Sequence, residues 1–381
     1  MERKKILIID NTALVDKNDR FFVTSSTGNL IKDLLKQGFI IELFQFRSSV
    51  IGNDLIHWFP ISDMPIRITT VPYSLRLKYL SYLISLKTAI ASILRNDFIY
   101  FFYPNSFRFL ALIAIALHKR IGLNIRGEKR IHDSLSRFLY RRSFVIFTVS
   151  PHFTQFAKKY CNFVFNKRPT TEFSLNDIVE KKDFINKKYY QLLFLARLDH
   201  DKGILDLLES VKLLNKSESI KFKLLIVGDG NAKNETQMFI TNNNLNNVIM
   251  YGAVVSKEEI KSLYECSDLY ILPSYHEGFP RTLYEAMMFK TPILTTFVGG
   301  IDCIMKDNFN CIKIEPHSPT SIAEKIEFAL THRDLMKKIT DNATNTCIDY
   351  FKQLPYSHGQ HLGYILSESQ WSKSSDCKHS N

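Results

Sequence analysis

The sequence predicts an α/β protein made of two doubly wound domains, and three observations lead to that prediction. The chain of 381 residues is long enough to bury two hydrophobic cores. Short apolar runs alternate with amphipathic stretches, which is typical of parallel sheets covered by helices. A polar, charged segment at 168–188 interrupts this alternation and marks a domain boundary. We therefore expect domains at 1–180 and 181–350, with a return segment or tail at 351–381.

The composition indicates a folded protein in a reducing compartment. Apolar residues make up 45% of the chain, which excludes a disordered protein. Six cysteines form no C-x-x-C pair and no metal-ligand cluster, so they are expected to be free thiols. The opening MERKKILIID is typical of a first strand rather than a secretion signal, and the longest apolar run, 109–117, is too short to span a bilayer. We expect a cytoplasmic protein.

The net charge of +12 lies entirely in the first half of the chain. Residues 1–185 hold 28 Lys and Arg against 15 Asp and Glu, hence +13, and the remainder holds 22 against 23, hence −1. No basic helix with interleaved aromatics, zinc finger or RNP-like run is present, so a nucleic acid is not expected as partner. The excess favours a lipid-pyrophosphate acceptor or peripheral contact with an anionic membrane at the inner face of the cell membrane, and simple solubility is the alternative.

The first half contains the elements of one doubly wound domain. Strands are predicted at 5–9, 39–44, 97–103 and 144–149, and helices at 30–37, 75–94, 107–117 and from Pro151. The stretch 53–74 carries no clear pattern. Gly28 precedes the first helix, where a glycine permits close backbone approach to a phosphate, although it could merely cap a turn.

The second half repeats the pattern more regularly. Strands are predicted at 191–196, 222–227, 248–251, 269–272, 293–295 and 311–314, and helices at 204–214, 256–266, from Arg281, and at 319–330. From about Pro355 the sequence is polar and carries little structural signal.

The most informative stretch is 269–289, LYILPSYHEGFPRTLYEAMMF. It predicts a buried strand, a polar loop and the start of a helix, the arrangement that binds anions in open α/β sheets. The amide groups of Arg281, Thr282 and Leu283 are expected to be free and to point toward the loop.

Two carboxylates, Glu277 and Glu285, lie in this stretch with E-x7-E spacing. A carboxylate next to an anion site is unfavourable unless it faces an uncharged partner, and sugar hydroxyls are suitable donors. The alternative is that Glu277 caps the helix and Glu285 is a solvated surface residue.

Two motifs together resemble glycosyltransferase family 4, a family of retaining enzymes. One is E-x7-E within HEGFPRTLYEAMMFKTPILTT, followed by Gly299 and Gly300, and the other is R-L-x3-K-G at 197–203. The resemblance covers 191–330 well and the first half loosely. It implies the GT-B fold, in which two Rossmann-like domains face a cleft and a C-terminal helix returns to the first domain, which 341–351 could begin.

The resemblance also implies roles for individual residues. Arg197 and Lys202, at a strand end, would supply positive charge to a leaving diphosphate, and Glu277 would hold the hydroxyls of the donor sugar. Glu285 would hold the ribose. Further donor-binding candidates are Gly28, Gly228, Val254, Gly278, Phe279, Thr282 and Leu283. An R-G-E motif places Arg126 and Glu128 on the acceptor side.

No metal or other cofactor is expected. Asp199 and Asp201 form a D-x-D pattern, which binds metals in other nucleotide-sugar enzymes, but a helix-capping role is preferred for Asp201.

The resemblance implies a retaining hexosyltransferase that uses a UDP- or GDP-linked sugar. The acceptor would be a glycan or lipid-linked saccharide in the biosynthesis of a cell-surface polysaccharide. Two alternatives stay open. One is a GT-B epimerase or hydrolase, for which Glu128 is the carboxylate candidate in the first domain, and the other is a non-catalytic partner subunit.

Overall fold

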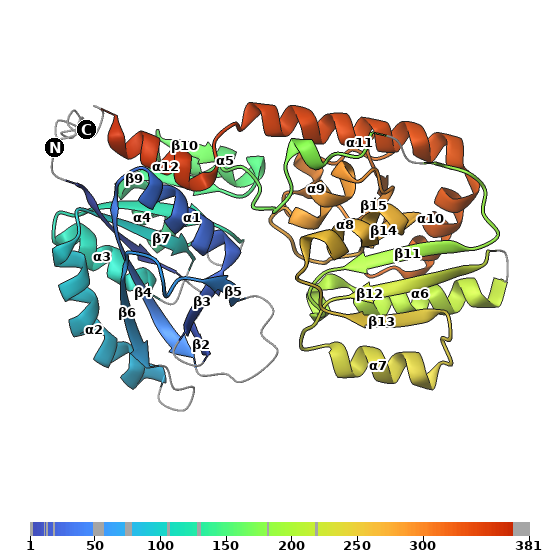
Figure 1. The fold of residues 1–381 in the computed structure, drawn as a ribbon, viewed down its shortest axis with the longest axis horizontal. Helices are drawn as coiled ribbons and strands as arrows, with labels where there is room; N and C mark the ends of the chain where they lie inside the picture. Colours follow the sequence, from blue (N-terminus) through green and yellow to red (C-terminus); the bar gives the residue numbers. More distant parts are fainter. Residues whose placement is uncertain are drawn as a thin grey trace. The chain divides into compact units, whose positions relative to one another are not determined.

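The structure, a computed structural model, describes residues 3–10, 12, 14–17, 20–48, 57–72, 78–104, 107–127, 131–180, 183–217 and 220–368. The chain forms two compact units, one from residues 1–168 with 354–381 and the other from 169–353. Figure 1 shows that each unit has a central sheet with helices against it. The chain leaves the first unit after residue 168 and re-enters it after residue 353. The boundaries expected from the sequence are at 180 and 350.

The first unit holds one mixed sheet and six helices among its described residues. Its strands are β1 (Lys5–Ile9), β2 (Leu14–Lys17), β3 (Arg20–Thr24), β4 (Ile40–Ser48), β5 (His57–Pro60), β6 (Arg67–Pro72), β7 (Phe98–Tyr103), β8 (Arg120–Ile125), β9 (Ser143–Thr148) and β10 (Val164–Asn166). Its helices are α1 (Ser25–Lys36), α2 (Lys78–Arg95), α3 (Arg108–Ala116), α4 (Ser134–Arg142), α5 (Pro151–Ala157) and α12 (His358–Ser367).

The parallel part of this sheet has the order β10-β9-β8-β7-β1-β4, and β6 also pairs with β4. In β1, Ile6, Leu7, Ile8 and Ile9 are all fully buried, because helices cover both faces of a parallel sheet. Ile6 and Ile8 pack on the side of α1 and α12, whereas Leu7 and Ile9 pack on the side of α3 and α5.

An antiparallel extension of this sheet lies outside the sequence-based prediction. β2 pairs with β3 and β3 with β5, and β2 joins the parallel part through β4. The predicted helix at 30–37 accordingly begins earlier, at Ser25, directly after β3. The hairpin was missed because its strands are short and only partly apolar.

The tail after Pro355 is also better ordered than its composition indicates. α12 begins with a capping box in which the Ser357 hydroxyl and the Gln360 side chain each bond the other residue's backbone. It packs against α1, and its Leu362 and Leu366 join the core of the first unit. The helix was missed because its signal is a cap and a few apolar residues rather than a long periodic run.

The second unit is a six-stranded parallel sheet. Its strands are β11 (Tyr190–Leu195), β12 (Phe222–Val227), β13 (Val248–Gly252), β14 (Leu269–Leu272), β15 (Ile293–Thr295) and β16 (Ile312–Lys313). Its α-helices are α6 (Ile204–Ser217), α7 (Lys233–Asn242), α8 (Lys257–Cys266), α9 (Arg281–Met288), α10 (Pro319–Thr331) and α11 (Arg333–Gln353), and its 3-10 turns are η1 (Leu175–Asp177), η2 (His200–Lys202) and η3 (Ile301–Cys303).

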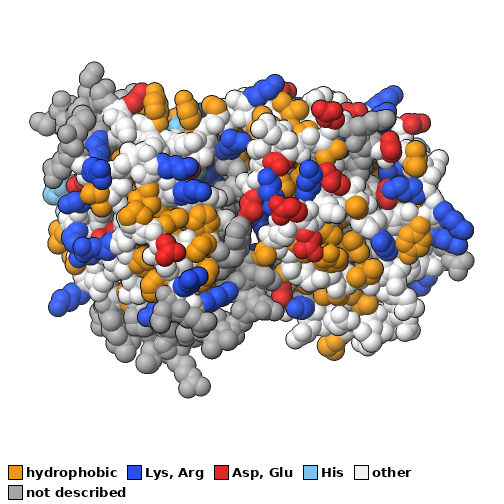
Figure 2. Space-filling view, viewed as in Figure 1, with side chains coloured by type: hydrophobic (Ala, Val, Ile, Leu, Met, Phe, Trp, Pro, Cys, Tyr) orange, Lys and Arg blue, Asp and Glu red, His pale blue; other side chains and the backbone are white. Residues whose placement is uncertain are grey.

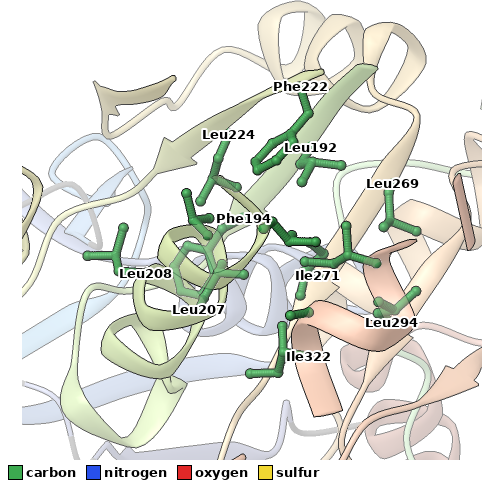
Figure 3. Packing of buried hydrophobic residues seen from close by; sticks show 14 of the residues in the cluster. Leu192, Phe194, Leu207, Leu208, Phe222, Leu224, Leu269, Ile271, Leu294 and Ile322 are labelled. Carbon is green, nitrogen blue, oxygen red and sulfur yellow. The ribbon is translucent and has the colours of Figure 1, made fainter. Parts of the chain in front are cut away.

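The strand order β13-β12-β11-β14-β15-β16 reverses direction between β11 and β14, the topological switch point of this sheet. Figure 3 shows the core on one face, where Leu192 and Phe194 of β11 meet Leu207 and Leu208 of α6. α8, α9 and α11 contribute to the core on the other face. Ligands in such folds bind outside the carboxyl ends of the strands at the switch point, which directs attention to the ends of β11 and β14.

Candidate active site

The loop between β14 and α9 runs from Pro273 to Pro280 and is held in place by its neighbours. The hydroxyl of Thr296 donates to the carbonyl oxygen of Ser274 at 2.6 Å, and the amide of Gly300 donates to the carbonyl oxygen of Gly278 at 3.0 Å. These contacts fix the backbone on either side of Glu277. The segment after β15 is therefore what positions the loop.

Lys202 and Glu277 meet at the switch point. The ammonium nitrogen of Lys202 lies 2.7 Å from Glu277 Oε1, and the hydroxyl of Ser274 donates to the same oxygen at 3.2 Å. Only about a tenth of each charged side chain is exposed, at 10% and 12%. The two residues come from different strand-loop segments, 75 positions apart, and they form the centre of the site.

Gly203 allows η2 to pack directly on the end of β14. Its φ is +67°, and a Cβ built there would lie 2.1 Å from the carbonyl oxygen of Pro273. Both a left-handed backbone and this contact require glycine. Lys202 precedes Gly203, so the same close packing brings its side chain toward the loop.

Arg197 is more exposed and pairs with a different carboxylate. Its guanidinium forms an ion pair with Asp199, and 55% of the Arg197 side chain is accessible. Asp201 lies 3.5 Å from the ammonium of Lys202. The site therefore contains two cations, Arg197 and Lys202, and three carboxylates, those of Asp199, Asp201 and Glu277. An anion would have to displace one of these pairings to meet a free positive charge.

The first turn of α9 is only partly available to an anion. The amide of Leu283 donates to the carbonyl oxygen of Pro280 at 3.2 Å, and the Leu283 side chain is fully buried. The prediction of a free Leu283 amide is therefore wrong, since the turn closes on itself. Pro280 gives the helix no side-chain cap, so Arg281 and Thr282 carry the remaining first-turn amides.

Glu285 is buried beneath α9 rather than solvated, which excludes the surface alternative. It is 4% exposed. The Thr171 hydroxyl donates to one carboxylate oxygen at 3.0 Å and the Tyr264 hydroxyl to the other at 3.3 Å. Burial raises the pKa of Glu285, although Arg281 and these hydrogen bonds lower it in part. Each oxygen retains a lone pair for a further donor such as a ribose hydroxyl.

Three further donor-side candidates lie at strand ends or in the loop. Gly228, after β12, has φ +148°, and a Cβ there would lie 1.9 Å from the carbonyl oxygen of Ala196. Val254 follows β13 and packs at the edge of the core. The Phe279 ring lies 4.5 Å from that of Tyr284, so it is held against α9. A glycine is therefore required at position 228 for the close packing of the ends of β11 and β12.

The sequence-predicted candidates of the first unit are Gly28, Arg126 and Glu128. Gly28 lies inside the first turns of α1, where it is buried, and a Cβ would come 2.2 Å from the Phe59 ring. The prediction that Gly28 opens the helix is therefore wrong, and its smallness serves packing against β5. Arg126 lies just after β8 with its guanidinium 4.0 Å from the Phe102 ring centre. Glu128 lies outside the described residues.

The D-x-D pair is engaged with protein groups. Asp199 accepts from the amide of Asn231 at 3.3 Å as well as from Arg197. Across the ranges that the structure describes, no three His, Cys, Asp or Glu side chains are grouped as metal ligands.

Sequence reasoning missed two side chains near the loop. The Tyr275 hydroxyl donates to Asp206 at 2.7 Å, and the Tyr275 ring stacks on His317 at 3.7 Å between centres. Tyr275 lies two positions before Glu277 in the loop that the sequence singles out, which was the available signal. His317 could not have been found, because only the fold brings it there.

The family model described as glycosyl transferases group 1 matches residues 176–346, all of which lie in the second unit. The match begins near the expected start of that domain and includes the predicted candidate residues of the second unit, whereas Thr171 and the candidates of the first unit lie outside it.

Two curated relatives match a similar part of the chain. The GalNAc-α-(1→4)-GalNAc-α-(1→3)-diNAcBac-PP-undecaprenol α-1,4-N-acetyl-D-galactosaminyltransferase of Campylobacter jejuni is 28% identical over 180 residues, 47% of each chain. The capsular polysaccharide biosynthesis glycosyltransferase CapM of Staphylococcus aureus is 29% identical over 170 residues, covering 42% of this chain and 43% of that one. The matched segment spans less than half the length of these relatives.

A solved structure resembles the chain over nearly its full length. The Anabaena protein HepE, crystallised with UDP, superimposes with a TM-score of 0.67 at 17% identity, covering 95% of this chain and 99% of HepE. At this level of identity the likeness concerns the fold.

Proposed function

Because residues 176–346 are a glycosyl transferases group 1 domain within a chain of GT-B fold, we propose that this protein is a retaining glycosyltransferase. It transfers a sugar from a UDP- or GDP-linked donor to a glycan or lipid-linked saccharide during the biosynthesis of a cell-surface polysaccharide. The curated relatives support the acceptor class, since one is named for a saccharide on undecaprenol diphosphate and one for capsular polysaccharide. The UDP complex of HepE supports the donor class.

The observation that carries this proposal is the Lys202–Glu277 pair at the switch point, 2.7 Å apart and nearly buried. A pair of opposite charges at a ligand-binding edge suits a donor that carries both a negatively charged diphosphate and sugar hydroxyls. The diphosphate attracts Lys202, and the hydroxyls of the sugar donate to Glu277. Donor binding would thus replace the contact between the two side chains by contacts of each with the donor.

The transfer itself requires stabilisation of the departing diphosphate. We infer that Lys202, Arg197 and the amides of Arg281 and Thr282 stabilise the negative charge that develops on it. The acceptor hydroxyl attacks the anomeric carbon on the face from which the diphosphate departs, so the configuration is retained. The bond to the diphosphate oxygen breaks, and that oxygen takes the proton of the acceptor hydroxyl.

The ribose of the donor is assigned to Glu285. Its two oxygens already accept hydrogen bonds from Thr171 and Tyr264, which fix the orientation of the carboxylate. A carboxylate held in this way is preorganised for a further hydroxyl, because its rotamer does not need to change on binding.

The test is a double-mutant cycle on Lys202→Met and Glu277→Gln. Both substitutions keep the side-chain volume and remove one charge. Transfer is measured as kcat/KM with a panel of UDP- and GDP-sugars, and UDP and GDP binding is measured by calorimetry. Each single variant should lose about 2–4 kcal/mol of transition-state stabilisation, the loss seen when one preorganised charge donor is removed.

The double variant distinguishes catalysis from stability. If the pair served the fold alone, removing both charges would restore thermal stability and activity together. We expect stability to recover and activity to stay low. Lys216→Met and Glu324→Gln, which alter exposed residues of the same unit, are the matched controls. Near-normal kcat/KM in both single variants would refute the assignment of the site.

We also propose that transfer needs no metal ion. Rates in excess EDTA should then equal those of untreated enzyme, because protein cations and helix amides supply the positive field. A strict requirement for Mg²⁺ or Mn²⁺ would instead point to Asp199 and Asp201 as metal ligands. The charges of the site make this outcome a fair test, because three carboxylates offset its two cations.

A further inference from the structure

Three charged side chains gather at the carboxyl edge of the first unit's sheet. Asp10 follows β1, Arg126 follows β8 and Lys167 follows β10. We call Arg126 and Lys167 the first-unit cationic pair. Carboxyl ends of parallel strands meet at one edge of a sheet, which explains how residues so distant in sequence approach one another.

Arg126 is held rigidly and keeps unused donors. Its guanidinium stacks on the Phe102 ring, and Nη2 donates to the hydroxyl of Ser26, in the first turn of α1, at 2.6 Å. Within the described ranges this is the one hydrogen bond of its side chain. Burial lowers the pKa of Arg126, and the nearby Asp10 opposes that effect. A guanidinium anchored through one nitrogen presents the others as a fork for an oxyanion.

Lys167 is the stronger indication of a ligand. The residue is 6% exposed, and its backbone amide donates to the carbonyl oxygen of Thr148 at 2.9 Å. Among the residues that the structure describes, its ammonium has no hydrogen-bond acceptor. Burial, followed by the repulsion of Arg126, lowers the pKa of Lys167 well below its usual range. An ammonium on a side chain this enclosed is stabilised by an anion that supplies the acceptor.

The neighbouring groups compensate this charge poorly. Asp10 is the one carboxylate that acts on both cations, and its oxygens already accept from the Thr27 hydroxyl and the Thr12 amide. His358, on α12, is buried beside the pair, and burial, Lys167 and Arg126 lower its pKa, so it stays neutral and adds no further positive charge. Asn124 has neither side-chain polar atom bonded to a described group.

Helix α1 adds a further attraction for an anion. It has 12 residues, no acidic residue in its first turn, and an N-terminal residue, Thr24, whose side chain does not cap it. Its first turn contacts the pair through Ser26. The positive end of the helix dipole and the two cations therefore act at the same place.

We propose that the first-unit cationic pair and the start of α1 form a binding subsite for an anionic group of the acceptor, a phosphate or a carboxylate. The inference rests on the proposed function, in which the donor's diphosphate is bound by the second unit. Arg126 would hold two oxygens of the anion and Lys167 a third, which would give the Lys167 ammonium an acceptor. The acceptor would then be an acidic saccharide or a saccharide phosphate.

The probe is inorganic phosphate, titrated into the full-length protein and followed by calorimetry and thermal shift. We expect saturable binding that weakens about tenfold or more in Lys167→Met, the loss typical of one charge-assisted hydrogen bond, and that Lys167→Arg retains. Lys158→Met, an exposed lysine of the same unit, should bind phosphate like the wild type. Circular dichroism verifies that each variant is folded.

Competition distinguishes the sources of the anion. Displacement of phosphate by glucuronate at comparable concentration would favour a carboxylate acceptor, and displacement by pyrophosphate alone a phosphorylated one. UDP affinity should change by less than about twofold in Lys167→Met, since the sites are independent. Three outcomes would overturn the proposal. The first is an equal loss of UDP and phosphate binding in Lys167→Met, and the second is a loss of phosphate binding in Lys202→Met but not in Lys167→Met. The third is that the wild type shows no saturable phosphate binding. Failure of the proposed function would appear separately, as absence of UDP and GDP binding or of transfer in the wild type.

Discussion

Gly203 shows how one residue can decide whether the candidate site assembles. Gly203→Ala places a methyl group 2.1 Å from the carbonyl oxygen of Pro273 and strains a backbone with φ +67°. We expect a loss of stability together with a large loss of transfer, because η2 must move and take Lys202 with it. Both are measured on the purified variant by thermal unfolding and kcat/KM.

The control for this substitution is Gly38→Ala, at another left-handed glycine with φ +84° and nothing within 4 Å of the added carbon. It carries the backbone strain without the collision, and it lies in the other unit. Equal effects on transfer from both substitutions would show that the close packing at Gly203 has no special role.

Asp133 offers a test of electrostatics at the level of a single carboxyl. Burial would raise its pKa, but hydrogen bonds from Arg108 and from Ser136 outweigh it and lower the pKa to about 2. A pKa below the unfolded value of about 3.9 stabilises the folded state above that pH, and the stabilisation disappears as the pH falls toward 2.

Asp133→Asn should therefore destabilise the protein at pH 7 by about 1 kcal/mol, a figure reduced because the carboxyl is partly exposed. The difference from the wild type should shrink as the pH falls below about 4, and thermal unfolding between pH 3 and 7 measures it. Asparagine still caps α4, so the cap is not what changes. A difference independent of pH would contradict the assigned ion pair.

At the scale of elements, α12 is the part of the first unit that comes from the far end of the chain. Leu362 is fully buried in the core shared with α1, and Gly359 lies so close to α1 that a Cβ would come 2.5 Å from the Cβ of Asp33. Leu362→Ala should cost about 2–5 kcal/mol, the range for buried leucines.

Hydrogen exchange followed by mass spectrometry locates this effect. Peptides of α1 and β1 should lose protection in Leu362→Ala, whereas those of β11 and β12 in the other unit should not. Tyr364→Ala, which alters a residue of the same helix that is 49% exposed, should change stability by no more than about 0.5 kcal/mol. Unchanged protection of α1 would mean that α12 contributes little to the first unit.

At the scale of the whole molecule, the uneven charge leads to a prediction about membranes. The basic residues of the first unit include Lys119, whose ammonium donates to two backbone carbonyls, and Arg120, which lies over the Phe144 ring. Lys129 and Arg130 lie outside the described residues. On the face that Figure 2 shows, Lys and Arg of the first unit are scattered among hydrophobic and uncharged groups. No described helix is long and apolar enough to cross a bilayer.

Helix α4 is the best candidate for membrane contact, because Arg137, Arg141 and Arg142 are exposed beside Phe138, which is 40% exposed. The full chain should co-sediment with anionic liposomes but not neutral ones, and less at high salt. Each arginine near the surface contributes about 1 kcal/mol.

Changing these three arginines to glutamine should therefore weaken binding strongly. Changing the exposed Lys216, Lys337 and Lys338 of the second unit removes the same charge and should have little effect. Equal weakening of liposome binding by both triple variants would show a general effect of net charge. If the wild type does not bind liposomes, the excess positive charge serves solubility alone.

The sequence by itself was sufficient wherever the determining pattern is local. Continuous apolar runs predict β1, β11 and β14, because a strand buried on both faces needs them. The GT-B fold and the resemblance to glycosyltransferases could be read from the motifs around Lys202 and Glu277, because each motif lies within one strand, loop and helix. Their meeting at 2.7 Å is consistent with that expectation, while their roles in transfer stay predictions.

Only the tertiary structure decided contacts between segments that are far apart in the chain. Thr171 reaches Glu285 across 114 positions, α12 enters the first unit from the far end of the chain, and Asp10, Arg126 and Lys167 converge because three parallel strands end at one edge. Sequence patterns report which face of an element is apolar and where it ends. They do not report which ends become neighbours, because strand order is set by the packing of helices on both faces of the sheet.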